Sequence, residues 1–316
     1  MSFQHIEDAA RAALAECGLA PPKQFEYDRF LVVDAEDGRR GNGAGRLKIY
    51  ADGQGGFCQN WKTGARKVFF LNAEGQSAAI SEAERLRIER ERKRRQAEES
   101  ARMDRAAKRA LAIWQPAAAA PVNHPYLVDK QIQACGTRAG TWKRMIEIDG
   151  RKQTVSIENA LLVPMFDAAG TLRSLQAIFP AKNPLFGFRN KDFLPGGGLA
   201  GLFWWIGPRA KNVEKVLICE GFATGATLHA ETGLRVYLAF TANNLLAVGR
   251  IVRDKLPNAE IVFAADNDSE TAGNPGLTKA SDAAAAVGGS VIVPPIPDAD
   301  FNDYAAFLRQ GGGDVD

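Results

Sequence analysis

The chain has 316 residues, of which 46% are hydrophobic and 24% charged, proportions typical of a water-soluble protein with a buried core and not of a disordered or membrane-embedded one. Its four cysteines and three histidines show no CxxC or CxxH spacing, which excludes a zinc ribbon and a disulfide framework. Neither a secretory signal nor an apolar run long enough to cross a bilayer is visible, so we expect a cytoplasmic protein of about two domains without membrane attachment.

The formal net charge of +3 is distributed unevenly along the chain. Residues 111–210 contain 11 basic and 6 acidic residues, whereas residues 211–316 contain 8 basic and 14 acidic ones. A basic middle followed by an acidic end suits a protein that binds a polyanion with one region and divalent cations with another.

Residues 1–80 predict a small β-rich module. A helical pattern begins near Ile6, and four short strand-like runs follow at 30–33, 47–50, 56–61 and 67–70. Two interpretations stay open for its aromatic and basic residues. Arg46, Lys48 and Trp61 could bind single-stranded nucleic acid, because bases stack on aromatic rings. Alternatively, the aromatic side chains form the core of the small sheet.

Residues 81–115 are dense in Glu, Arg, Lys and Ala and predict a charged helical linker. Residues 116–210 predict a basic subdomain. Within it, apolar runs at 160–166 and 172–179 flank a turn at 167–170, which is the pattern of a β-hairpin.

Residues 211–310 alternate between apolar strand-like runs and helical stretches, and residues 311–316 form a short tail. The strands are expected at 213–219, 235–240, 260–265 and 290–294, and the helices at 222–231, 243–254, 277–287 and 302–310. Continuously apolar strands separated by helices predict a parallel sheet covered by helices on both faces, which is an α/β fold.

Acidic residues follow three of these four strands. They are Glu220 after the first, Asp266 and Asp268 after the third, and Asp300 and Asp303 after the fourth. An Asp after a strand is commonly only a helix N-cap. Carboxylates gathered at one edge of a sheet repel one another unless a cation neutralises them, and oxygen ligands without His or Cys favour Mg²⁺ or Mn²⁺. We therefore predict a metal site for phosphate chemistry at this edge.

The pattern of strand-Glu220-Gly221, strand-Asp266-Asn267-Asp268 and a later acidic loop resembles the Toprim domain of primases, topoisomerases and some nucleases. Upstream, the run 162–167 with Gly170 and the run 191–194 look like the basic half of a bacterial-type primase core. Residues 300–303 are similar to the terminal acidic loop of plasmid- and phage-encoded primases.

This resemblance implies a DNA primase that makes RNA primers on single-stranded DNA from ribonucleoside triphosphates, with Glu220, Asp266 and Asp268 as catalytic, metal-binding acids. Asp300 and Asp303 would complete the metal site. Template or triphosphate would bind to four basic residues, Arg173, Lys182, Arg189 and Lys191. The zinc ribbon that commonly precedes such cores is absent, and so is a Walker-type ATP-binding motif, which implies a separate replicative helicase as partner.

Two other functions remain open at this point. A Toprim nuclease would use the same acids to cleave DNA. A nucleic-acid-binding accessory protein of a mobile element would carry an inactive metal site. Metal-dependent nicking without nucleotides would distinguish the first, and binding without synthesis or cleavage would distinguish the second.

Overall fold

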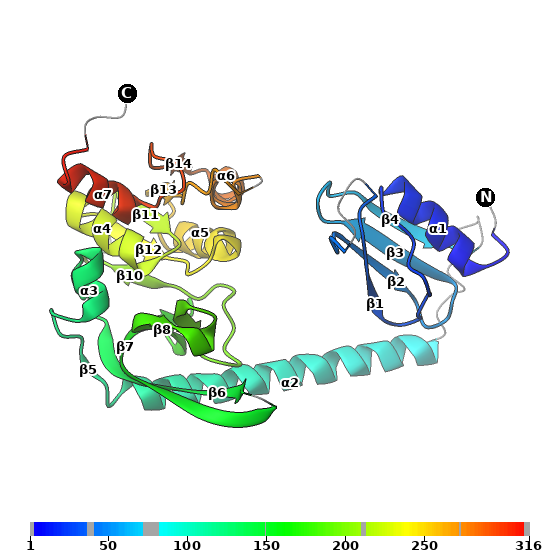
Figure 1. Ribbon diagram of the computed structural model, residues 1–316, viewed down its shortest axis with the longest axis horizontal. Coiled ribbons are helices and arrows are strands. Elements are labelled where there is room, and N and C mark those ends of the chain that lie inside the picture. The colour runs from blue at the N-terminus through cyan, green and yellow to red at the C-terminus, as the bar shows by residue number, and fades with distance from the viewer. Residues whose placement is uncertain are drawn as a thin grey trace. The chain divides into compact units, whose positions relative to one another are not determined.

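The computed structural model describes residues 3–36, 41–71, 82–148, 150–209, 213–271 and 273–312. The predicted domain boundaries at 80/81 and 210/211, and most of the predicted tail, lie outside these residues. The chain divides into two compact units, Met1–Lys93 and Arg94–Asp316, and the division falls within the long helix α2, Glu82–Trp114 (Figure 1). Each unit has its own buried core.

The first unit is a four-stranded antiparallel sheet with one helix on one face. Apolar side chains at three- and four-residue intervals on the helix, from Ile6 to Leu14, are buried against alternate residues of the strands, such as Leu47 and Cys58. Sequence-based expectations for this module agree with the elements found. These are α1 Ile6–Glu16, β1 Phe30–Val33, β2 Gly45–Ile49, β3 Gly55–Asn60 and β4 Arg66–Phe70.

The second unit begins with an antiparallel sheet in the order β5-β6-β7-β8-β9. The predicted hairpin is present, and its turn is closed by Asp167, whose Oδ1 accepts hydrogen bonds from the backbone N–H of Ala169 (3.0 Å) and Thr171 (2.9 Å). The sheet and its neighbours comprise β5 Ala118–Ala119, α3 Pro125–Lys130, β6 Arg138–Ile148, β7 Arg151–Phe166, β8 Leu172–Asn183, η1 Pro184–Phe186 and β9 Arg189–Phe193.

The rest of the unit is the predicted parallel sheet, which has the order β10-β12-β11-β13-β14. Four strands are parallel, and β10 adds an antiparallel edge beside β12. The elements are β10 Trp204–Ile206, β11 Lys215–Cys219, α4 Phe222–Thr232, β12 Arg235–Leu238, η2 Ala242–Asn244, α5 Leu245–Lys255, β13 Glu260–Ala264, α6 Pro275–Val287, β14 Ser290–Ile292 and α7 Phe301–Arg309.

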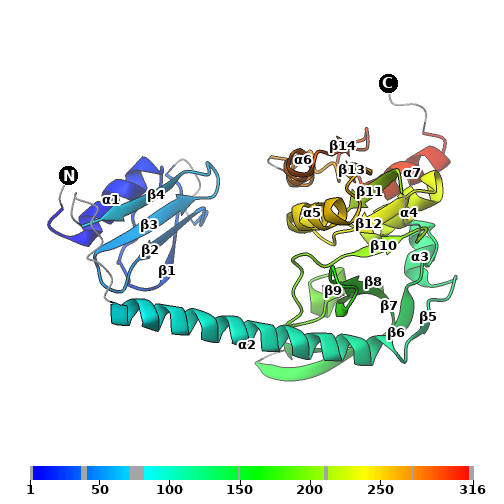
Figure 2. The same cartoon turned by 180° about the vertical axis from the view of Figure 1, so that it is seen from behind.

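Helices cover both faces of this sheet, as the continuously apolar strands predict. The pair α4 and α7 packs on one face and the pair α5 and α6 on the other (Figure 2). The two faces belong to two hydrophobic cores, and the residues of the three central strands β11, β12 and β13 are nearly all buried. The α/β fold class expected from the sequence is confirmed. Within the part of the chain that the structure describes, no helix is both long and apolar enough to span a membrane.

Candidate active site

Glu220 is the first residue after β11, and the strand-to-helix junction holds it in place. Its backbone carbonyl accepts a hydrogen bond from the N–H of Phe240 (2.8 Å), and Gly221 is the N-cap of α4. Partial burial raises the pKa of the Glu220 carboxyl, and the negative charge of Asp268 raises it further. The backbone N–H of Ala242 and the cation of Lys191 oppose this shift.

Asp266 is the most perturbed carboxyl of the site. Burial, followed by the negative charges of Glu220, Asp300 and Asp268, raises the pKa of Asp266 to about 7. Its Oδ1 is buried and has no hydrogen-bond partner among the described residues. A buried carboxylate oxygen without a partner is costly, so this atom is a place where a cation or a proton would stabilise the protein.

Asp300 and Asp303 form the start of α7. Asp300 is the N-cap, and its Oδ1 accepts hydrogen bonds from the N–H of Asn302 (2.7 Å) and Asp303 (3.0 Å). Asp303 completes a capping box and pairs with Lys130 (3.1 Å). Asp300 lines the pocket described below, whereas Asp303 does not. The helix-cap interpretation therefore holds for both residues, and Asp300 also faces the other acids.

Asn267, which the sequence analysis quotes in the acidic motif without a role, joins the acidic loops. Its backbone pairs with Ala299, and its Nδ2 donates to the carbonyls of Pro294 (3.2 Å) and Ile296 (3.0 Å). Its Oδ1 accepts a hydrogen bond from Asn274 (3.1 Å). These contacts join the loop of Asp266 to the segment before α7, so one side chain sets the spacing between two groups of carboxylates.

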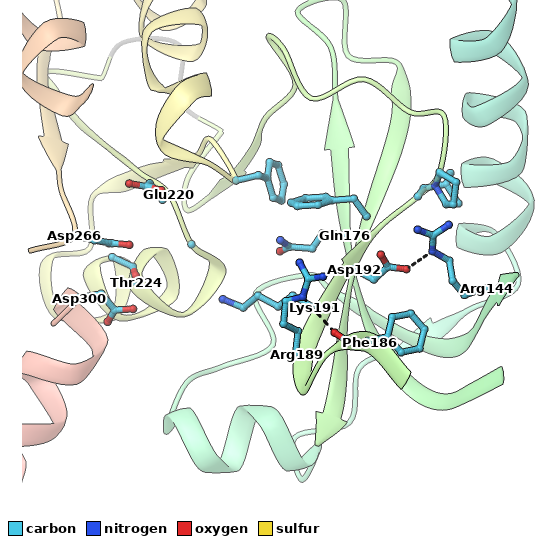
Figure 3. A pocket seen from close by; sticks show the side chains of 15 residues that line it. Arg144, Gln176, Phe186, Arg189, Lys191, Asp192, Glu220, Thr224, Asp266 and Asp300 are labelled. Atoms are coloured by element: carbon cyan, nitrogen blue, oxygen red, sulfur yellow. Dashed lines mark hydrogen bonds and ion pairs between the residues drawn. The ribbon is translucent and has the colours of Figure 1, made fainter. Parts of the chain in front are cut away.

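A pocket of about 510 Å³ lies between the acidic edge of the parallel sheet and the antiparallel sheet (Figure 3). The acidic wall is formed by Glu220, Asp266 and Asp300. The opposite wall is basic and contains Lys191 and Arg189 of β9 together with Arg144 of β6. The pocket is further lined by Gln176, Phe186, Asp192, Phe193, Leu194, Pro195, Gly221, Thr224 and Phe240.

Lys191 extends from β9 toward the acidic wall (Figure 3). The surrounding protein atoms lower its pKa, and the carboxylates of Asp300 and Asp266 oppose that shift. Among the described residues no salt bridge within 4.0 Å is found for Lys191, so its charge interacts with several acids at longer range. Such a cation is available to an anionic ligand in the pocket.

Arg144 was missed by the sequence analysis, and Asp192 was noted only within the run 191–194, without a role of its own. Oδ2 of Asp192 accepts hydrogen bonds from Nε of Arg144 (2.8 Å) and Nε1 of Trp142 (2.9 Å), which leaves the outer part of the Arg144 guanidinium at the pocket. The missing signal is structural. Residues 144 and 192 lie on β6 and β9, which are not neighbours in the sheet, so their contact depends on how the whole sheet folds and no local pattern reports it.

The four predicted nucleic-acid contacts have different surroundings. Lys191 and Arg189 line the pocket, and Nε of Arg189 donates to the carbonyl of Phe186 (3.2 Å). Arg173 instead pairs with Asp104 of α2 (2.8 Å), which ties β8 to that helix. Lys182 is exposed near the end of β8, outside the pocket lining. A contact of Arg173 or Lys182 with nucleic acid stays a prediction.

The three predicted contacts of the N-terminal module lie on its surface. Arg46 and Lys48 are on β2, where Nη1 of Arg46 donates to the carbonyls of Gly43 and Gly45, and Lys48 pairs with Asp28 (3.1 Å). Trp61 follows β3 and is 62% exposed. The aromatic side chains are therefore only partly used for the core, in which Phe69 and Phe25 are buried.

The donor atoms of the acidic wall suit a hard divalent cation. In the described residues, no three Asp, Glu, His or Cys side chains are arranged to hold an ion by themselves. Mg²⁺ commonly takes only one or two carboxylates and completes its shell with water and substrate phosphates. The unpartnered oxygen of Asp266 beside Glu220 and Asp268 fits that mode of binding.

Residues 215–312 match the model of the Toprim domain. The match begins at the first residue of β11 and extends beyond α7, so it includes all five predicted acids. The predicted resemblance to the Toprim domain is confirmed.

Two curated proteins from Escherichia coli, both named DNA primase TraC, are similar to this chain. One is 30% identical over 276 residues and the other 29% identical over 274 residues. Each alignment covers 83% of this chain, but only 23% and 17% of the respective relatives. The chain thus spans less than a quarter of the length of these relatives.

Two solved structures are also similar. The DnaG primase catalytic domain bound to ssDNA has a TM-score of 0.46 and 11% sequence identity, over 69% of this chain and 79% of that one. The RNA polymerase domain of Mycobacterium tuberculosis primase DnaG has a TM-score of 0.42 and 16% identity, over 68% of this chain and 80% of that one.

Proposed function

We propose that this chain, a relative of DNA primase TraC with a Toprim domain at residues 215–312, synthesises RNA primers on single-stranded DNA. The observation that carries the proposal is the pocket with an acidic wall facing a basic wall. A nucleoside triphosphate with a bound divalent cation carries the complementary pattern of charges. The named relatives favour primase over the nuclease and accessory alternatives.

Glu220, Asp266 and Asp268 are the proposed metal-binding and catalytic acids, with Asp300 beside them. Bound Mg²⁺ or Mn²⁺ would stabilise charge on the triphosphate and lower the pKa of the attacking 3′-hydroxyl. The chain's own part is to place this charge: β11 and β13 deliver the acids to one edge of the sheet, and Asn267 holds the loops that carry them. Asp303 is bound to Lys130, so its role would be to fix the start of α7.

Lys191, Arg189 and Arg144 are the proposed phosphate contacts. In nucleotidyl transfer, the 3′-hydroxyl oxygen of the primer forms a bond to the α-phosphorus, and the bond to the leaving pyrophosphate breaks. Cations on the wall opposite the acids can neutralise the negative charge of that pyrophosphate as it leaves. Asp192 would orient Arg144 through its 2.8 Å contact with Nε.

Primer synthesis on a single-stranded template with ribonucleotides and Mg²⁺ or Mn²⁺ tests the proposal. The double substitution Asp266→Ala, Asp268→Ala should reduce synthesis by about 100-fold or more, because it removes charge that stabilises the transition state. Asp254→Ala, Asp282→Ala removes the same charge from α5 and α6, away from the pocket, and should keep near-normal activity. Full activity in the first variant would rule out this mechanism, and metal-dependent cleavage without nucleotides would indicate a nuclease.

The basic wall has its own test. Lys191→Met should raise KM for ribonucleotides by roughly 10-fold or more, because a charge-assisted contact to phosphate is lost. Lys279→Met is the matched control, since Lys279 is an exposed lysine of α6 outside the pocket lining. Equal effects of the two substitutions would show that general positive charge, and not the position of Lys191, supports binding.

We further propose that the protein acts in the cytoplasm with a separate helicase. Unwinding of duplex DNA supplies the single-stranded template that primer synthesis needs. Stimulation of primer synthesis on duplex DNA by an added helicase would support this partnership.

A further inference from the structure

One face of the N-terminal sheet is left open by the helix that covers the other. Leu47, Cys58 and Phe69 point to α1 and are buried with it, so their neighbours along each strand point to the opposite face. We name this opposite side the open face. Its residues are Phe30 and Val32 of β1, Arg46 and Lys48 of β2, Phe57 and Gln59 of β3, and Arg66, Val68 and Phe70 of β4.

The register of the four strands interleaves rings and cations on the open face. Phe30, Lys48, Phe57 and Val68 are successive partners across the sheet. The rings of Phe30 and Phe57 meet edge to face at 5.9 Å. Nζ of Lys48 lies 5.4 Å from the Phe30 ring centroid, and the Arg66 guanidinium lies 5.1 Å from that of Phe57. Each ring therefore has a cation beside it.

Phe57 is half-buried, but Phe30 and several apolar side chains around it are exposed, which is unusual for a surface that serves only folding. Phe30 and Val32 are each 61% exposed, and Phe70 is 40% exposed. A contiguous exposed apolar patch usually marks a binding surface. The unit already buries a core on its helix side, so the open face does not contribute a second core within this unit.

The charge of the open face indicates which kind of molecule it binds. The outward strand positions include three basic residues and no acidic one; Asp28, in the loop before β1, pairs with Lys48 (3.1 Å). A partner that presents flat rings together with repeated negative charge matches both features. Single-stranded nucleic acid has this chemistry, because unpaired bases expose faces that stack on aromatic rings while phosphates contact cations.

We propose that the open face binds single-stranded DNA by stacking bases on Phe30 and Phe57, with Arg46, Lys48 and Arg66 contacting phosphates. We name DNA and not RNA because the proposed function uses a DNA template. The binding of an unpaired strand is inferred from the aromatic and basic side chains of the open face alone. Trp61, the 62% exposed residue that follows β3, would extend the platform at one end. The module would then hold template through contacts separate from the pocket.

Binding of a fluorescein-labelled oligothymidylate to the full chain, measured by anisotropy in EDTA without nucleotides, tests the stacking. Phe30→Leu, Phe57→Leu keeps apolar side chains but removes both rings, and should weaken binding by roughly 10-fold or more. Phe57→Tyr keeps a ring and should bind within about twofold of the parent chain. Unchanged affinity in the double variant would overturn the proposal, as would equal affinity for blunt duplex DNA.

Two neighbouring basic residues of β4 allow the contribution of positive charge on the open face to be tested against a control. Arg66 belongs to the open face, whereas Lys67 points to the helix side and pairs with Glu16. Arg66→Ala should weaken binding and lower its salt dependence, while Lys67→Ala should leave both unchanged. Equal losses would mean that net charge, and not this face, attracts DNA.

These measurements separate the open face from the proposed catalysis. Because they omit metal and nucleotides, they give the same result whether or not the pocket synthesises primers. Asp266→Ala, Asp268→Ala should keep the single-stranded DNA affinity of the open face even where primer synthesis is lost. The same affinity for oligouridylate would show that the face recognises single strands of either sugar and would overturn the preference for DNA.

Discussion

At the scale of single residues, the carboxylates of the candidate site lie close enough to repel one another. Burial and the negative charges of Glu220, Asp300 and Asp268 raise the pKa of Asp266, burial and Asp268 raise that of Glu220, and Lys191 compensates only in part. A folded protein keeps such an arrangement at a cost to its stability unless a ligand relieves the repulsion. The buried Oδ1 of Asp266 has no hydrogen-bond partner among the described residues, so a bound cation or proton would stabilise the site most at this atom.

This charge predicts how stability depends on pH in the metal-free protein. The pKa of Asp266 is raised from 3.8 to about 7, so the folded state holds this proton more tightly than the unfolded state does. The stabilisation is complete below the unfolded pKa and is lost as pH rises through about 7. Between pH 5 and pH 8 the loss should be on the order of 2 kcal/mol.

Urea unfolding in EDTA at both pH values measures this loss. Asp266→Asn cannot ionise and should show a smaller decrease in the free energy of unfolding from pH 5 to pH 8 than the parent chain. Added Mg²⁺ should restore stability at pH 8 in the parent chain more than in the variant. A pH dependence that is identical in the two proteins would contradict the assignment.

At the scale of elements, the junction between β11 and α4 places Glu220. The two glycines of this junction have different surroundings. A Cβ on Gly225 would overlap Cδ2 of Leu238, a fully buried residue of β12, and would lie 3.2 Å from Sγ of Cys219. A Cβ on Gly221 would meet only Oγ1 of Thr224, at 3.5 Å. Close packing of helix on sheet thus accounts for Gly225.

The contrast gives a paired prediction. Gly225→Ala should lower the free energy of unfolding by about 1–3 kcal/mol, because α4 must move away from the sheet. Gly221→Ala adds the same methyl group where space exists, and its backbone angles, φ −100° and ψ 154°, suit alanine. It should change stability by less than about 1 kcal/mol, since only the N-cap preference is affected. Chemical denaturation of the two variants checks this, and equal destabilisation would contradict the packing argument.

At the scale of the whole molecule, the two units have separate hydrophobic cores. One core contains Leu14 of α1 with residues of the N-terminal sheet, and the others belong to the two sheets after residue 94. Separate cores allow separate unfolding, so a single two-state transition is not expected for the chain.

Differential scanning calorimetry should therefore resolve two transitions. Leu14→Ala removes a fully buried side chain and should lower the Tm of one transition only, at a cost of about 2–5 kcal/mol. Gly225→Ala should lower only the other. One transition that moves with both substitutions would show that the units unfold together.

The sequence by itself determined the elements whose patterns are local. Apolar runs of five to seven residues separated by helical stretches determine the parallel sheet between residues 213 and 294, because continuously apolar strands must be covered on both faces. The hairpin around Asp167 and the helix of residues 82–114 follow from equally local signals. Acids after parallel strands also had to share an edge, since such strands all end on the same side.

Only the tertiary structure decided which side chains meet across elements. β6 was missed because its alternating exposed residues give no apolar run, and with it Arg144 was missed. Arg173 lies against Asp104, Asp303 against Lys130, and Phe57 beside Arg66, at sequence separations that no local pattern reports. The physical reason is that periodicity depends on neighbours within one element, whereas partners depend on strand register and on the packing of whole elements against one another.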